Sequence, residues 1–384
     1  MAVLSQSLDL RGLPEVTAAL AAQAEANDRS AAYPADGIRV VHEAGLLTAT
    51  VARDYGGPGG GLADGVRILT ALGKGDPSVA LIAAMTLLQH ATQAAERTWP
   101  DDTYQQVVTE SQAAPVLINA LRVEPELGTP ARGGLPATIA RRTAEGWAIT
   151  GRKIFSTGAE GLTWMVVWAR TEDAEPRVGG FLVRGDGPGI TIERTWDHMG
   201  LRASRSDDVI LTGAPATGTT GLDAPRPGVV GGATFSAWNS LGLAALYLGV
   251  AHAARDWLIT FLNERTPTSL GAPLATLPRF QAAVGEIEAQ LMTAGDLLDG
   301  LAERADAGDE AAVARASAAK LIVNRASISA VEQALALVGN NGLMRRNALE
   351  RHLRDVLCSR VHSPQDDTIV AGLGKAALGK AAAR

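Results

Sequence analysis

The sequence has a single cysteine, Cys358, among its 384 residues. One thiol excludes a disulfide framework within the chain and is typical of a reducing compartment, so we predict a cytoplasmic protein. A lone cysteine of this kind is more often a small buried hydrophobe than a nucleophile. The six histidines show no zinc-ligand spacing and no HExxH motif occurs, so we predict no metal site.

Long apolar runs, basic runs and a targeting segment are also missing. The longest apolar stretches, 79–88 and 241–251, are shorter than the roughly 18 residues that a membrane-spanning helix needs. The first residues, MAVLSQSLDLRGLP, have no basic start followed by an apolar core, which argues against a secretion signal. A formal net charge of −6 and the lack of lysine or arginine clusters argue against a nucleic-acid partner.

The sequence does contain three segments with different periodicities. Apolar spacing is helical from about residue 13 to 114, changes to a period of two from 115 to 224, and returns to long helical patterns afterwards. We therefore predict an N-terminal helical domain (1–114), a central β domain (115–224) and a C-terminal helical bundle (225–384). Long helices are expected at 233–264, 278–307, 309–338 and 349–361.

Seven short strands without intervening helices favour an antiparallel barrel or sandwich over a Rossmann domain. They are expected at 115–120, 138–144, 147–154, 163–169, 180–183, 190–196 and 208–211, with a hairpin at Glu145-Gly146 and a turn at 212–218.

Two glycine-rich stretches do not qualify as phosphate sites. The cluster at 56–61 has no preceding parallel strand and no suitably placed lysine, so we predict a loop there. The stretch 374–380 has Walker spacing, but Ala381 replaces the required serine or threonine. We predict a helical tail at this position.

Several separate motifs resemble those of the acyl-CoA dehydrogenase superfamily of flavoproteins. The stretch 151–171, GRKIFSTGAEGLTWMVVWART, resembles a G-x-K-x-aromatic-x-(Thr/Ser)-x-Gly turn that lies against a flavin. Residues 123–129, VEPELGT, resemble a Thr-Glu-Pro-x-x-Gly-Ser signature, and 351–355 matches Arg-x-x-Arg-Asp. The resemblance covers most of the chain. It implies an α+β fold with an N-terminal helical domain, a central antiparallel β-barrel and a C-terminal four-helix bundle.

The resemblance implies FAD, or alternatively FMN, as cofactor. It places an aromatic residue, here Phe155, against the isoalloxazine and a hydroxyl, here Thr157, near the reactive nitrogen. Arg265 resembles an arginine that reaches the flavin pyrophosphate of a neighbouring subunit, so a homodimer or homotetramer is expected. The implied cofactor-binding residues are Val123, Gly128, Thr129, Phe155, Ser156, Thr157, Arg265, Gly339, Asn340 and Gly342.

The catalytic carboxylate of the dehydrogenases is missing. Removing the α-proton of a thioester needs a base that faces the flavin, and the family carries a glutamate where this chain has Ser363. A second position used by some branches holds Asn239, followed by Ser240 where acyl-CoA binders often have arginine. Asp366 and Asp367 are expected to face the helix that follows them.

Loss of the base with retention of the flavin site resembles the two-component monooxygenase branch. Those enzymes take reduced flavin from a separate reductase and oxygenate a small molecule through a flavin C4a-hydroperoxide. By position, His362 and His90 match histidines beside the flavin in that branch; with Ser363 and Asn119 they are the expected catalytic residues. His90 alone fits a buried core histidine better. Two alternatives stay open: dehydrogenation of an acyl-CoA with an atypical base, and a non-catalytic flavin-binding or assembly protein.

Overall fold

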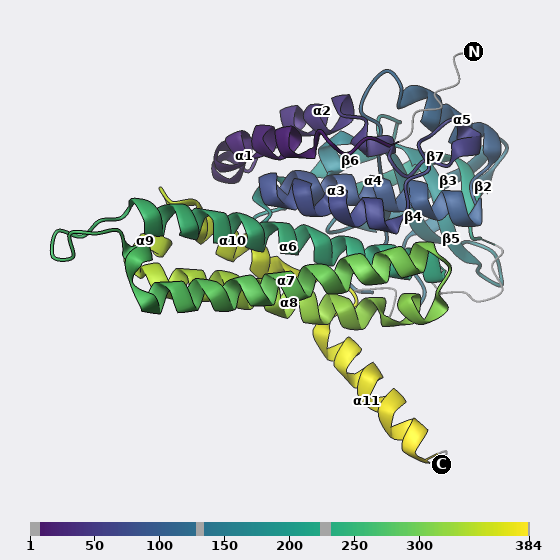
Figure 1. The fold of residues 1–384 in the computed structure, drawn as a ribbon. Helices are drawn as coiled ribbons and strands as arrows, with labels where there is room; N and C mark the ends of the chain where they lie inside the picture. The colour runs from purple at the N-terminus through teal and green to yellow at the C-terminus, as the bar shows by residue number, and fades with distance from the viewer. Residues whose placement is uncertain (1–7, 128–133, 223–231, 383–384) are drawn as a thin grey trace.

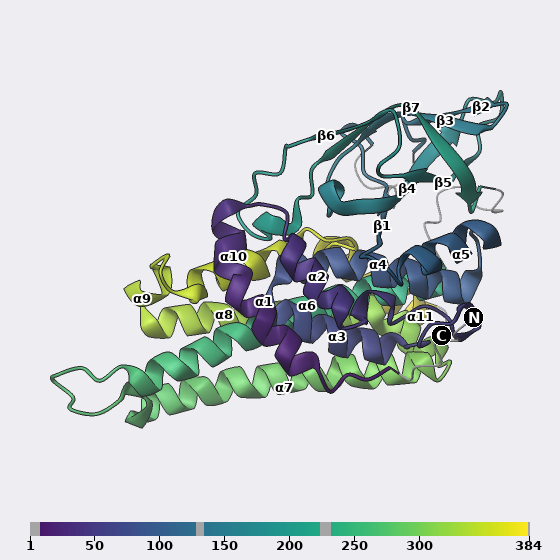
Figure 2. The ribbon, with the colours of Figure 1, turned by 90° about the horizontal axis from the view of Figure 1, so that it is seen from above.

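The computed structural model describes residues 8–127, 134–222 and 232–382. It confirms the predicted order of helices, strands and helices along the chain. Figure 1 shows the N-terminal helices lying along a long C-terminal bundle, with the strands gathered toward one end. Figure 2 shows the strands as a body of their own, joined to the helices where α4 meets β1. The precise domain boundaries stay a prediction.

The N-terminal helices begin and end largely as local chemistry dictates. Asp76 caps α4, because its carboxylate accepts hydrogen bonds from the backbone N–H groups of Ser78 (2.9 Å) and Val79 (3.4 Å). The glycine cluster at 56–61 is a loop, as predicted. The helices are α1 Leu13–Ser30, α2 Ala35–Glu43, α3 Leu62–Gly75, α4 Pro77–Glu96 and α5 Asp101–Glu110, with short 3-10 turns at Leu46–Thr48 and Arg53–Tyr55.

The strands close into a barrel. The ring runs β4-β2-β3-β7-β5 and returns to β4, while β1 and β6 pair along β4 and β7. A closed ring has no exposed edge along these five strands, which removes a route to aggregation. The strands are β1 Leu117–Leu121, β2 Ile139–Thr143, β3 Gly146–Lys153, β4 Leu162–Thr171, β5 Val178–Arg184, β6 Ile190–Glu193 and β7 Asp208–Thr220.

Two predictions about the barrel are wrong in detail. Its pairing is not uniformly antiparallel, because β1 and β2 both pair with β4 in parallel. The predicted turn at 212–218 lies inside β7. Gly213 has a φ of +65° there, and this left-handed residue lets the strand bend without ending. The bent strand pairs with β3 and β6 through its first half and with β5 through its last residues.

The C-terminal helices surround α6, which is buried along much of its length. Close packing at its glycines explains this burial. A Cβ at Gly73 of α3 would collide with the backbone of Leu246, and one at Gly249 with that of Thr70, so no side chain separates the two helices there. The helices are α6 Ala233–Glu264, α7 Pro278–Asp306, α8 Glu310–Val338, α9 Asn340–Leu343, α10 Ala348–Leu357 and α11 Asp366–Ala382.

Helix α8 has the length and apolar composition of a membrane-spanning helix. Half of its most apolar window is buried inside the protein, where α8 packs against α6, α7 and α10. This is the environment of a core helix in a soluble bundle, and we interpret it so. Helix α11 carries the 374–380 stretch and projects from the bundle (Figure 1), as expected for a helical tail.

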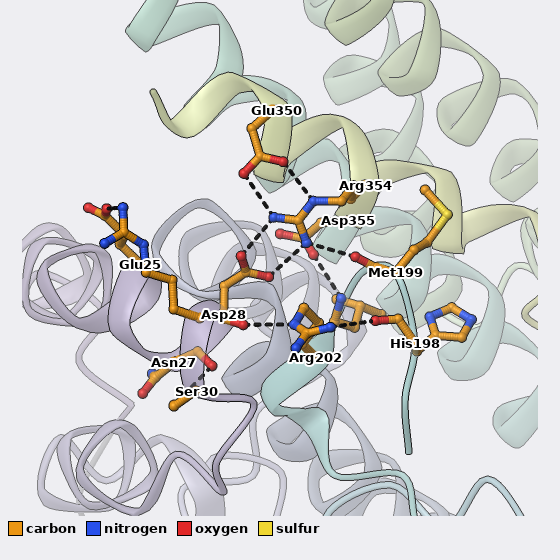
Figure 3. Close-up of polar contacts among 12 residues, drawn as sticks. Glu25, Asn27, Asp28, Ser30, His198, Met199, Arg202, Glu350, Arg354 and Asp355 are labelled. Carbon is orange, nitrogen blue, oxygen red and sulfur yellow. Dashed lines mark hydrogen bonds and ion pairs between the residues drawn. The ribbon is translucent and has the colours of Figure 1, made fainter. Parts of the chain in front are cut away.

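A polar junction joins α1, the segment 198–202 and α10 (Figure 3). Arg354 donates two hydrogen bonds to Asp28 (2.8 and 2.7 Å), two to Glu350 and one to the carbonyl of Met199. Bidentate guanidinium–carboxylate contacts of this kind fix both distance and orientation. The Arg354 and Asp355 pair of the Arg-x-x-Arg-Asp motif therefore locks the three parts of the chain together.

Asp355 is the buried acid of this junction. Its carboxylate accepts a hydrogen bond from the backbone of Leu201 (2.7 Å), yet burial raises its pKa from 3.8 to about 7. Between about pH 4 and pH 7 the unfolded side chain is ionised while the folded one keeps its proton, so unfolding releases a proton. The contribution of Asp355 to stability is therefore lost as the pH rises through this window.

We expect Asp355→Asn to remove this pH dependence. Because each pKa unit corresponds to about 1.4 kcal/mol, the Tm of the variant relative to the native protein should be higher at about pH 8 than at about pH 5. Thermal unfolding followed by circular dichroism measures the difference. The matched control is Asp197→Asn, whose side chain is fully exposed. A Tm difference that is equal at both pH values would contradict the expectation.

Candidate functional site

A buried ion pair joins the two motifs of the β domain. Lys153, at the end of β3, donates to Glu124 across 2.6 Å, and the side chains are 0% and 2% exposed. Glu124 also accepts from the backbone N–H groups of Ala137 (2.6 Å) and Thr138 (3.1 Å), and Lys153 donates to the carbonyl of Trp168. The lysine of one motif thus holds the glutamate of the other.

Burial affects the two partners in opposite ways. It lowers the pKa of Lys153 to about 8, although the hydrogen bond to Glu124 opposes this. It works to raise the pKa of Glu124, but the hydrogen bond and charge of Lys153 outweigh burial and hold that pKa below its usual value. Both groups are therefore charged at neutral pH. Each side chain also has hydrogen-bond partners besides the other, as a buried ion pair requires.

The turn after Lys153 presents an aromatic ring to solvent. Phe155 has a φ of +55°, a conformation that side chains rarely adopt, and it is 61% exposed. The ring meets Trp196 edge to face at 6.4 Å. A strained, exposed phenylalanine costs free energy unless something covers it, so the turn has the features of a shelf for a flat apolar ligand.

Hydrogen bonds from neighbouring segments hold this turn in place. The amide of Asn119, on β1, donates to the carbonyl of Thr157 (3.0 Å), and the Thr157 hydroxyl lies 3.0 Å from that of Ser206. Asn119 is 5% exposed and Thr157 8%. The structure therefore brings Asn119, Phe155 and Thr157 together, beside Val123, whose carbonyl accepts from the N–H of Ile154 (3.0 Å).

Sequence reasoning missed the segment 196–207 that supports the turn. Its carbonyls accept the N–H groups of Ser156, Gly158 and Ala159, and two non-glycine residues in it, Leu201 and Arg205, have positive φ. Asp207 fixes the segment by accepting from the N–H of Trp196 (2.8 Å). The dense polar run RASRSDD at 202–208 is the feature that could have indicated it.

A second cluster lies in the segment 361–365, between α10 and α11. Nδ1 of His362 lies 2.7 Å from the Tyr247 hydroxyl on α6, and the amide of Asn239, also on α6, donates to the carbonyl of Ser363 (2.8 Å). Lys320 of α8, 1% exposed, donates to the carbonyls of His362 (2.6 Å) and Pro364 (2.7 Å). Asn239 and Ser363, the two positions at which the resemblance leads us to expect a base, are therefore hydrogen-bonded to each other.

His362 stays neutral at physiological pH. Burial, followed by the charge of Lys320, lowers its pKa to about 3. Burial also holds the pKa of Tyr247 well above 10, so the phenol keeps its proton. If that proton is donated to Nδ1, the imidazole carries its own proton on Nε2.

His90 lies in a third environment. It is fully buried on α4, its Nδ1 is 2.9 Å from the Tyr104 hydroxyl, and burial lowers its pKa to about 4. Its Nε2 has no hydrogen-bond partner among the described residues. No hydrogen bond among the described residues joins it to His362 or Asn119, so these three of the four expected catalytic residues do not form one hydrogen-bonded set.

The remaining predicted cofactor residues lie elsewhere. Arg265 follows the last residue of α6, 26 residues after Asn239, which corresponds to roughly 40 Å along a helix. Gly339 precedes α9, and Asn340 and Gly342 lie within it; Figure 1 shows α9 at the end of the bundle remote from the strands. Gly128 and Thr129 lie outside the described residues.

Whether a flavin fits the turn can be judged from its polar groups that lack a hydrogen-bond partner and from its exposed apolar side chains. The Ser156 hydroxyl is buried within the turn without a partner among the described residues, while the adjacent Phe155 ring is exposed. A ligand with a flat apolar face would cover the exposed ring, whereas the buried Ser156 hydroxyl is not accessible from outside the turn. A separate pocket of about 340 Å³ contains none of the predicted site residues. It is lined by Asn324, Arg325, Ile328, Ser329, Glu332, Arg360 and Asp366.

Cys358 is buried and free, and burial raises its pKa to about 12, which argues against a nucleophile.

Comparison with known proteins gives three family matches along the chain. Residues 15–102, 122–214 and 241–366 match the N-terminal, middle and C-terminal domains of acyl-CoA dehydrogenase. The YdbM protein of Bacillus subtilis (strain 168), provisionally named an acyl-CoA dehydrogenase, is 34% identical over 92% of each chain. The amino sugar nitrososynthase DnmZ of Streptomyces peucetius is 30% identical over 94% of this chain and 91% of its own.

Solved structures add a ligand-bound example. KijD3 in complex with FMN and dTDP-3-amino-2,3,6-trideoxy-4-keto-3-methyl-D-glucose is 25% identical, with a TM-score of 0.80 over 99% of this chain and 97% of that chain. The similar proteins thus include both dehydrogenase and nitrososynthase names.

We expect Lys153→Met to lower stability sharply, because it leaves Glu124 buried without a counter-charge. Breaking such a pair costs about 3–5 kcal/mol, and thermal unfolding measures the loss as a lower Tm. The control is Arg141→Gln, since its side chain is 71% exposed and that of its partner Glu172 is 49% exposed, and exposed pairs contribute at most about 1 kcal/mol. Equal Tm values for the two variants would mean that the buried pair does not hold the motifs together.

Proposed function

The chain belongs to the acyl-CoA dehydrogenase family, and we propose that within it this protein is a flavin-dependent monooxygenase. The observation that best supports this proposal is the hydrogen bond between Asn239 and Ser363. These are the two positions at which the dehydrogenases place their base, and neither holds a carboxylate. Oxygenation needs no α-proton base; it needs a dry site with hydrogen-bond donors near the flavin.

The proposed flavin lies on the turn of the β domain. Phe155 would cover one face of the ring system, and the Thr157 hydroxyl and the backbone at Val123 would bind its polar edge. When bound in its reduced form, the cofactor supplies the electrons that activate O2. FAD and FMN both fit this part of the site, and a separate reductase is the proposed source of reduced flavin.

His362 is the proposed proton holder of the site. A neutral imidazole whose Nδ1 is engaged by a protonated Tyr247 can present an Nε2–H donor. Lys320 fixes the backbone on both sides of Ser363, so the donor keeps its position. His90 can shape the site only indirectly, because its exposed fraction is 0%.

Acyl-CoA dehydrogenation is the second candidate, and the similarity to YdbM favours it. It would require a displaced carboxylate. Asp366 does not offer one, because it pairs with Arg325 (3.2 Å) on the side of α8 that lines the separate pocket. Ser240 is fully buried, so it cannot replace an arginine that binds CoA.

The positions of the two proposed cofactor half-sites support a homo-oligomer. Arg265 and the α9 turn lie too far along the bundle to reach the flavin of their own chain. They would serve the flavin of a second copy, whose bundle end would approach this β domain. The proposed substrate is a small molecule; nucleotide-sugar recognition, seen in the KijD3 complex, is one chemistry that this scaffold supports.

The reaction can be tested on flavin-loaded protein in a stopped-flow instrument. Anaerobic mixing with a panel of acyl-CoA thioesters should leave the oxidised flavin absorbance unchanged. After chemical reduction and mixing with O2, we expect a transient absorbance that differs from both the reduced and the oxidised flavin. His362→Ala should shorten its lifetime about tenfold or more and increase hydrogen peroxide release, whereas His42→Ala on α2 should not.

Three outcomes would count against the proposal, each in a different way. Bleaching of the flavin by a thioester would establish dehydrogenation and exclude the proposal. Reoxidation that is indifferent to His362→Ala would remove the proton-holding role from this residue. Protein that purifies colourless and takes up no flavin would support the non-catalytic alternative.

The shared site can be tested by complementation between subunits. Phe155→Ala and Arg265→Gln should each weaken flavin binding about tenfold, because each removes one half of every site. Coexpression with different tags should restore tight binding to half of the sites in mixed dimers, measured by flavin fluorescence. Arg279→Gln, at an exposed position on α7, is the control. If mixed dimers bind no better than either parent, each chain completes its own site.

A further inference from the structure

One charged side chain at the site has no established partner. Arg122 follows β1 and immediately precedes Val123, and its guanidinium lies 4.2 Å above the ring of Phe235 in the first turn of α6. Phe235 is one helical turn before Asn239, on the same face of α6. The Arg122–Phe235 pair therefore bridges the proposed flavin turn and the cluster around His362.

The guanidinium of Arg122 is poorly compensated. It makes no hydrogen bond or ion pair with the described residues. Burial lowers its pKa to about 9, and only the more distant charge of Glu96 opposes this shift. A guanidinium has five N–H donors in a planar fork, and placing it in a half-buried position without acceptors is costly. A ligand that supplies two oxygens would remove this cost.

Glu96, the acid whose charge acts on Arg122, does not provide the missing acceptor oxygens. Glu96, at the end of α4, accepts the backbone N–H of Gly232 (3.1 Å), the residue that precedes α6. Its carboxylate therefore neutralises the start of the helix, where backbone N–H groups are unpaired. No described residue therefore supplies an acceptor for the fork of Arg122.

We propose that Arg122 binds an oxyanion of the substrate, a carboxylate or phosphate, with the Phe235 ring stacked beneath the fork. This inference rests on the proposed function, because it assumes a flavin next to Val123. The flavin's own phosphate is a less suitable occupant. Val123 adjoins the ring system in the proposed arrangement, whereas Arg265, which the sequence implies as a phosphate ligand, lies at the far end of α6. The substrate class is thus small molecules with a terminal oxyanion.

The test titrates simple aryl probes into the flavin-loaded protein and follows the flavin absorbance. Benzoate and phenyl phosphate should bind, and Arg122→Gln should weaken them about tenfold or more, since a bidentate charge-assisted contact is lost. Arg122→Lys should weaken them less, because it keeps the charge but not the fork. Neutral benzamide should bind native protein and variants equally. Whichever anion binds tighter identifies the carboxylate or the phosphate as the recognised group.

Arg142→Gln is the matched control. Arg142 also lies over an aromatic ring, that of Trp147 at 4.4 Å, but on the exposed hairpin of β2 and β3. Equal probe affinity in native protein and Arg122→Gln would overturn the proposal. So would a loss of flavin affinity in Arg122→Gln, which would assign the guanidinium to the cofactor.

A failure of the proposed function would be visible separately. If the protein takes up no flavin, probe binding is measured by calorimetry on the flavin-free protein. Dependence of that binding on Arg122 would then support an oxyanion site without a flavin beside it, and independence would exclude the site. Arg122→Lys keeps the test valid if Arg122→Gln does not fold.

Discussion

The site depends on one constraint, the buried ion pair between Lys153 and Glu124. Charges in a protein interior are tolerated only when each has its partners. Here the requirement fixes the end of β3 against the segment that follows β1, two places far apart in the sequence. The strained Phe155 and the adjacent Val123 follow directly from these two anchored points. The ion pair that stabilises this part of the barrel therefore also positions the turn that is proposed to bind the flavin ring.

Local features of the chain could be predicted from the sequence because they depend on neighbouring residues. The start of α4 at Asp76 and the positions of most strands are of this kind. The parallel pairing of β1 with β4 could not be predicted, since strand periodicity does not say which strand lies beside which. The turn expected at 212–218 failed because a single left-handed glycine can bend a strand without ending it.

The candidate site was predictable only in part, for the same reason. Phe155, Thr157 and Asn119 lie together in the structure, but the partners that hold them, Ser206 and Asp207, come from a segment with no periodic pattern. Lys320 looks like an ordinary helix residue until its position beneath His362 is known. His90 is the opposite case. Its position in the sequence matched a histidine beside the flavin, whereas the structure buries it like a core residue.

The polar junction of Figure 3 has a consequence for the order in which the chain can fold. Asp28 is synthesised early, the N–H of Leu201 much later, and their partners Arg354 and Asp355 close to the end. Domains generally fold as they leave the ribosome, beginning at the N-terminus. Even if the first helices and the barrel fold early, these groups must stay solvated until the last tenth of the chain is made. A nascent chain arrested before α10 should then be an early target for chaperones.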